Sequence, residues 1–178
     1  MGTLEVLLTL PVSTRDLVLG KFTAGVVLVA VALALTAPLP IMVSMLGDLD
    51  WGPVVGGYVG ALLLGALYLS IGLCVSARTD NQVVSLMLTL VIGGAMVAIG
   101  STPVTSLFDQ ATGEVLRALG TGSRFASIER GVLDLRDALY YVGLTTFFLV
   151  LNWHFLESAR IDAGAETGRR HRRHLALF

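Results

Sequence analysis

A Gly–Lys pair at Gly20 and Lys21 is the first feature of the sequence that could do chemistry. A phosphate-binding loop, Gly-x-x-x-x-Gly-Lys-Ser/Thr, surrounds phosphates with backbone N–H groups and adds a lysine. Arg15 stands where that loop needs its first glycine, and Phe22 stands where it needs a hydroxyl. The pair also lies within a helical pattern, so we expect no ATP binding here. We interpret Lys21 as a charge at the end of an apolar span.

Other residue types that bind metals or act as nucleophiles are scattered. Asp48 and Asp50 lie in the turn "GDLDWGP" without the rest of a calcium loop, which indicates solvated turn residues. Cys74 is the lone cysteine and lies in an apolar run, as a small buried hydrophobe would. His154 lies near the end of such a run and is interpreted as interfacial. We therefore expect no catalytic, cofactor-binding or metal-binding residues, and no enzyme.

The apolar runs dominate the chain of 178 residues, of which 54% are hydrophobic and 14% charged. Soluble domains carry nearer a quarter charged residues. Four runs contain no Asp, Glu, Lys or Arg: 22–47, 52–77, 81–108 and 138–156. Each is long enough, at about 1.5 Å per residue, to cross a hydrocarbon core of roughly 30 Å. A soluble helical protein would need polar helix faces, so we predict an all-α integral membrane protein with four transmembrane helices.

The ends of these helices carry start and stop signals. Ser13 with Asp16, and Thr79 with Gln82, match a capping pattern, and the "PLP" sequence should kink the far end of the first span. Trp51 is typical of an interfacial anchor. The predicted transmembrane region, 17–156, has spans at about 17–45, 53–76, 81–100 and 138–156, and a loop at 101–137.

Small residues line the second span. Gly56 and Gly60 form a G-x-x-x-G, and Gly72 with Ser76 repeats the spacing. Such faces let helix backbones approach closely. We predict helix packing at these four positions, either within the bundle or at a dimer face.

Basic residues indicate the orientation. Arg15, Lys21 and Arg78 lie at the starts of the first and third spans, and "RRHRRH" lies in the tail, 157–178. The positive-inside rule then places both termini in the cytoplasm, at the plasma (inner) membrane. We expect the basic tail to contact anionic membrane lipids rather than nucleic acid, because no recognition module accompanies it.

The loop at 101–137 contains a further helical pattern. The apolar residues Phe125, Ile128, Val132 and Leu135 recur at helical spacing. Arg130 and Asp134 form an i, i+4 pair on another face of the same predicted helix. This predicts one amphipathic helix before the last span. It either lies along the outer membrane surface, caps the bundle or is a solvated loop helix.

Several segments together resemble ABC-2 type transporter permeases, specifically the gliding-motility-associated kind. They are "GTLEVLLTLPVSTRDLVLGKF", "GDLDWGPVVGGYVGALLLGALYLSIGL", "TDNQVV" and "RFASIERGVLDLRDALYY". The resemblance extends to about Leu156. It implies a permease subunit that couples ATP hydrolysis on a partner to substrate transport. The alternative is a non-transporting membrane scaffold or accessory protein.

The resemblance also implies a short cytoplasmic coupling helix within residues 1–16 that docks on the ATP-binding subunit. Carried over to this sequence, the helix spans Thr3 to Leu10. Leu4, Leu7 and Leu8 share one face, and Glu5 and Thr9 share another. Two turns are too short to be stable alone and need a surface, either the partner or the inner leaflet.

Permeases of this kind normally have six spans, and two would precede the coupling helix. We expect a truncated gene model, with a fragment or a split permease as the alternatives. The resemblance further implies a second permease half or a homodimer, and an extracytoplasmic accessory subunit. The four uncharged runs contain no acidic, basic or histidine residue other than His154, so any driving energy must come from a partner. The sequence indicates neither the substrate nor the direction of transport.

Overall fold

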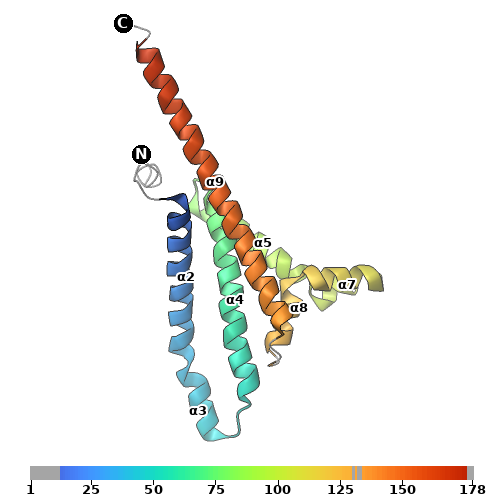
Figure 1. Ribbon diagram of the computed structural model, residues 1–178. Coiled ribbons are helices and arrows are strands. Elements are labelled where there is room, and N and C mark those ends of the chain that lie inside the picture. The colour runs from blue at the N-terminus through green and yellow to red at the C-terminus, as the bar shows by residue number, and fades with distance from the viewer. Residues whose placement is uncertain (1–12, 130, 132–133, 176–178) are drawn as a thin grey trace.

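The protein folds entirely into helices and turns in the part that the structure describes. The structure is a computed structural model and describes residues 13–129, 131 and 134–175, with side chains as far as 161 except that of Glu129. Figure 1 shows the helices α2 (Thr14–Thr36), α3 (Pro38–Leu46), α4 (Trp51–Ser76), α5 (Gln82–Ile99), α6 (Thr102–Thr105), α7 (Gln110–Leu119), α8 (Thr121–Glu129) and α9 (Leu135–Leu175). The all-α fold expected from the sequence is confirmed.

Four of these segments are long and apolar enough to cross a membrane. They are Thr14–Leu46, Trp51–Ser76, Gln82–Ile99 and Leu135–Ile161. The first consists of α2 and α3, which separate at Ala37, immediately before Pro38. Proline cannot donate the helical hydrogen bond to the preceding turn, so the helix bends there. The prediction of four transmembrane helices is therefore confirmed.

Side-chain caps fix where the long helices begin. The Ser13 hydroxyl accepts a hydrogen bond from the Asp16 N–H (3.1 Å), as the capping pattern predicts. The cap predicted at Thr79 is wrong, because its hydroxyl instead donates to the carbonyl of Val75 in the preceding helix. Asn81 caps α5, and its side chain accepts from the Val83 N–H (2.9 Å).

Helix α4 lies at the centre of the bundle and contacts α2, α5, α8 and α9. Its residues Leu67 and Ile71 are fully buried and cluster with Tyr141 of α9. Figure 1 shows α9 crossing α4 and continuing well beyond it toward the C-terminus. The start of α2, the α4–α5 turn and the later part of α9 share one end, which we call the basic end. The α3–α4 turn lies at the opposite end, the loop end.

The chain between α5 and α9 differs from the predicted single helix. Helix α8 ends at Glu129, Gly131 adopts the left-handed conformation (φ +85°), and α9 begins at Leu135. The prediction that Phe125 to Leu135 share one helix is wrong, because a left-handed residue interrupts it. Leu135 is 72% exposed. The predicted partners Arg130 and Val132 lie outside the described residues.

Asp134, assigned above to the same helix, precedes α9 instead. Its carboxylate accepts from the Arg136 N–H (2.9 Å), as a residue at the start of a helix does. Helix α8 packs on the bundle, since Ile128 is only 1% exposed and belongs to the core cluster around Leu67. Of the three positions left open for this segment, the structure places it against the bundle.

Candidate functional site

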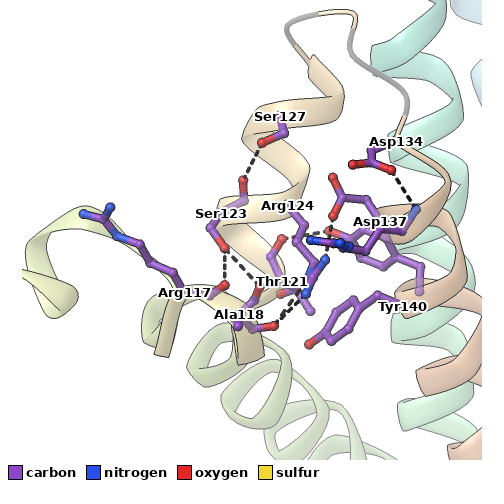
Figure 2. A network of polar contacts seen from close by, with 12 residues as sticks. Arg117, Ala118, Thr121, Ser123, Arg124, Ser127, Asp134, Asp137 and Tyr140 are labelled. Carbon is purple, nitrogen blue, oxygen red and sulfur yellow. Dashed lines mark hydrogen bonds and ion pairs between the residues drawn. The ribbon is translucent and has the colours of Figure 1, made fainter. Parts of the chain in front are cut away.

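An ion pair joins α8 to the start of α9. Arg124 Nη1 lies 2.6 Å from Asp137 Oδ1, and their side chains are 17% and 12% exposed (Figure 2). The pair lies at the loop end, where α9 enters its apolar stretch. Because both charges are largely removed from solvent, the pairing neutralises what would otherwise be costly isolated charges.

The two other nitrogens of the Arg124 guanidinium also donate hydrogen bonds. Its Nε and Nη2 donate to the carbonyl of Ala118 (3.3 and 3.0 Å), and its guanidinium lies 4.3 Å from the ring centre of Tyr140. The Tyr140 hydroxyl donates to the carbonyl of Leu119. One arginine thus connects the end of α7 to α9 (Figure 2).

Tyr141 makes the deepest of these contacts. Its side chain is fully buried, and its hydroxyl donates to the carbonyl of Thr121, the first residue of α8 (2.8 Å). We call Arg124, Asp137, Tyr140 and Tyr141 the loop-end network. Its charged groups are paired and its tyrosines donate to backbone carbonyls, so the arrangement is suited to holding helices together rather than to proton transfer.

Glycines allow α8 to approach its neighbours. A Cβ on Gly56 would lie 2.4 Å from the carbonyl oxygen of Ile128, and one on Gly60 would lie 3.0 Å from the Ile128 side chain. At the other end of α8, a Cβ on Gly120 would lie 2.2 Å from the Cα of Gly100. These crossings leave no room for a side chain.

Helix α7 begins with a short polar turn. Asp109 precedes it, and its carboxylate accepts from the Thr112 hydroxyl (2.6 Å). That hydrogen bond holds the pKa of Asp109 below its ordinary value, because it stabilises the ionised carboxylate.

Two arginines hold α9 at the basic end. The Arg15 guanidinium lies 4.3 Å from the ring centre of Trp153, and the Arg78 guanidinium lies 4.0 Å from that of Phe155. Cation–π contacts of this kind contribute about 0.5–1 kcal/mol each at exposed sites. They connect the start of α2 and the α4–α5 turn to the same turn of α9.

Among the grooves on the described part of the bundle are two of several hundred Å³. The larger, about 610 Å³, runs between α4 and α5, where Gly72 faces Thr89 and the Tyr68 hydroxyl donates to the carbonyl of Gly93 (3.3 Å). The second, about 510 Å³, lies between α4 and the first span, beside the hydrogen bond between Thr36 and Tyr58 (2.8 Å). Both are lined mainly by apolar side chains.

The residues predicted for function fall in two groups. The coupling residues, namely Thr3, Leu4, Glu5, Leu7, Leu8 and Thr9, lie outside the described residues. The structure places Gly56 and Gly60 under α8, Gly72 against α5, and Ser76 at a small cavity between α2 and α9. Within the described residues no group of His, Cys, Asp and Glu could hold a metal ion.

The sequence reasoning missed the loop-end network. Its signal was the set of four arginines in 101–137, which is unusual for a loop predicted to lie outside the membrane. In the structure Arg124 is paired in the fold, and Arg117 donates to the Thr105 hydroxyl (3.2 Å). These two arginines therefore have structural partners.

Comparison with known proteins identifies the chain. Residues 1–153 match the family described as ABC-2 family transporter protein, which is a family of membrane permease components of ABC transporters. No curated protein and no solved structure matches the chain. Since the match covers most of the sequence and the fold supplies four apolar helices of membrane-spanning length, the chain belongs to the ABC-2 family of transporter proteins.

Proposed function

We propose that this protein is the membrane-spanning permease subunit of an ATP-driven transporter, worked by an ATP-binding subunit on a separate chain. The observation that carries the proposal is the family match over residues 1–153. Charged side chains lie near the ends of the described spans and not in their middles. The middles of these spans therefore supply no charged side chain that could couple transport to an ion gradient. Energy for transport then enters through a partner.

The proposed contact with that partner is the segment from Thr3 to Leu10. Three residues separate it from α2, whose Arg15 is stacked on Trp153 of α9. In this proposal a movement of the segment is passed to α2 and through Arg15 to α9. The proposal also includes a second permease half or a second copy of this chain, and an extracytoplasmic accessory subunit. Membership of the gliding-motility-associated subgroup rests on the resemblance of the quoted segments.

The proposed division is a coupling segment at 1–16, a transmembrane domain at 17–156 and a cytoplasmic tail at 157–178 in the plasma membrane. The basic end carries Arg15, Lys21, Arg78 and Arg160, which supports a cytoplasmic placement by the positive-inside rule. In this proposal Gly56, Gly60, Gly72 and Ser76 pack helices within one chain.

Coupling can be tested by co-purification of this chain with an ATP-binding subunit from its native membrane. The double variant Leu4→Glu/Leu7→Glu places charges on the apolar face, and Glu5→Gln on the other face is the matched control. We expect the double variant to lose the ATP-binding subunit while the control retains it. Unchanged co-purification of the double variant would show that the segment is not the docking site, and ATP hydrolysis by the isolated chain would refute the permease assignment.

Orientation is tested separately by labelling single cysteines in intact cells, in a Cys74→Ala background. A membrane-impermeant maleimide should label Asp48→Cys, in the α3–α4 turn, but not Asp80→Cys, in the α4–α5 turn. The reverse pattern would invert the proposed topology and leave the family assignment intact.

A further inference from the structure

A small cavity lies where α2, α4 and α9 meet near the basic end. Its volume is about 30 Å³. Most of its wall is apolar, and the polar side chains on it are Lys21 of α2, Ser76 of α4 and Asn152 of α9. Each of three helices thus contributes one residue with a polar side chain to the lining, of which Asn152 is buried and Lys21 and Ser76 are exposed.

Asn152 is the unusual member of this set. It lies within the apolar stretch of α9, is only 3% exposed, and its Oδ1 has no hydrogen-bond partner within the described residues. Burying an amide oxygen without a donor is unfavourable, and hydrocarbon offers no alternative donor. The amide therefore requires a donor inside the cavity that it lines.

The cavity's size and charge select the occupant. A water molecule needs roughly 10–15 Å³ of such space and two to four polar partners. This cavity has the volume, and three of the residues that line it carry polar side chains. A metal cation is disfavoured because Lys21, a cationic residue, is among those that line the cavity, and no group of carboxylates, thiols or imidazoles adjoins it among the described residues. Larger polar ligands exceed the volume.

We propose that this cavity is a hydration site for one ordered water, bridging Asn152 Oδ1 to the Lys21 ammonium and the Ser76 hydroxyl. The water donates to Asn152 and accepts from Lys21, so its donor and acceptor capacity match the groups around it. The site lies beside the cation–π contacts of Trp153 and Phe155, and it adds a polar bridge between α2 and α9 there. It does not depend on the transport proposal.

The test is a thermal double-mutant cycle on the full-length chain in lipid nanodiscs. Asn152→Leu, which is nearly isosteric, should lower Tm by about 2–4 °C, the shift expected when a chain of this size loses one bridging interaction. Lys21→Met should lower Tm by less in the Asn152→Leu protein than in the unaltered protein, because both variants break the same bridge. A rise in Tm for Asn152→Leu would show that the amide is dry and unpaired, and additive effects would show that Lys21 is not its partner.

A direct hydrogen bond from Lys21 to Asn152 would also couple the two residues. A variant that fills the cavity distinguishes that direct bond from a water bridge. Ala77→Val adds methyl groups to the cavity wall. If water forms the bridge, Ala77→Val displaces it and abolishes the coupling between Asn152 and Lys21. Coupling that persists in Ala77→Val would overturn the water bridge. Thr146→Val, on an exposed part of α9 where the hydroxyl donates to its own helix, is the matched control and should show no coupling to Lys21→Met.

Discussion

The packing of α8 on α4 can be tested by adding one methyl group to α4, in the variant Gly56→Ala. Alanine at Gly56 would place its Cβ 2.4 Å from the carbonyl oxygen of Ile128 and 3.3 Å from the Cα of Gly131. Carbon–oxygen contacts in proteins begin at about 3.3 Å, so α8 must move by about 1 Å. Both atoms in its way belong to backbone, which cannot turn aside as a side chain can.

Overpacking of this kind costs about 1–3 kcal/mol in the free energy of unfolding. At roughly 2–4 °C per kcal/mol for a chain of this length, Gly56→Ala should lower Tm clearly. The neighbouring Gly57 provides the control, because a Cβ there meets nothing within 4 Å. Gly57→Ala should be neutral or slightly stabilising, since alanine favours the helix over glycine by up to about 1 kcal/mol.

The assay is thermal unfolding of the full-length chain in nanodiscs, followed by tryptophan fluorescence. Trp51 lies five residues before Gly56 in α4 and Trp153 lies in α9, so the signal reports on both helices. Equal Tm values for the Gly56→Ala and Gly57→Ala proteins would refute the packing of α8 on this face. A loss confined to Gly56→Ala would support it.

Three further predictions concern polar contacts. Arg124→Gln should lower the free energy of unfolding by about 1.5–3 kcal/mol, and by much less in an Asp137→Asn background, in a double-mutant cycle. Arg78→Gln should lower it by about 0.5–1 kcal/mol through loss of the cation–π contact, measured as a Tm difference from Arg78→Lys. For Asp109, whose pKa is lowered in the fold, the stabilisation is present above its unfolded pKa and is lost as the pH falls through the folded value. Thr112→Val should raise the pKa of Asp109 toward its ordinary value, as followed by NMR.

These three predictions have distinct contradicting results. An Arg124→Gln effect that persists undiminished in the Asp137→Asn background would mean that the ion pair is not the source of the stability. If Arg78→Gln and Arg78→Lys unfold alike, either the cation–π contact contributes nothing or lysine does not make it, and Phe155→Leu separates the two. An unchanged pKa of Asp109 in Thr112→Val would show that another group holds it low.

The spans could be predicted from the sequence because a bilayer imposes a local rule. A helix that crosses hydrocarbon must satisfy its own backbone and carry few charges, and both properties can be read in one stretch of sequence. The first span shows the rule and its limit. Its length and its proline bend were predictable. Its packing against α4 was not, because the hydrogen bond from Thr36 to Tyr58 joins residues of two different spans.

Partners between distant segments were not predictable in the same way. The G-x-x-x-G at Gly56 and Gly60 indicates close approach but does not say which element approaches, and the structure places α8 there. The helical spacing from Phe125 to Leu135 is real in the sequence, yet Gly131 ends the helix within it. Periodicity measures a preference for a helix, and one left-handed residue can interrupt it without disturbing the spacing.

The distribution of polar contacts along α9 connects these observations. Asp137 and Tyr141 fix one end of its apolar stretch to α8, and Trp153 and Phe155 fix the other end to arginines of α2 and the α4–α5 turn. From Asp137 to Trp153 the helix rises roughly 24 Å at 1.5 Å per residue, which is most of a hydrocarbon core. Within a membrane, a polar group can fix the register of two helices only where a partner neutralises its charge or forms its hydrogen bonds. Elsewhere the register must be fixed by the fit of apolar side chains and glycines. Glycines set the distances along α4 for that reason. Asn152, a buried polar residue beside Trp153, is a position where the amide oxygen has no partner among the described residues and therefore requires an additional one.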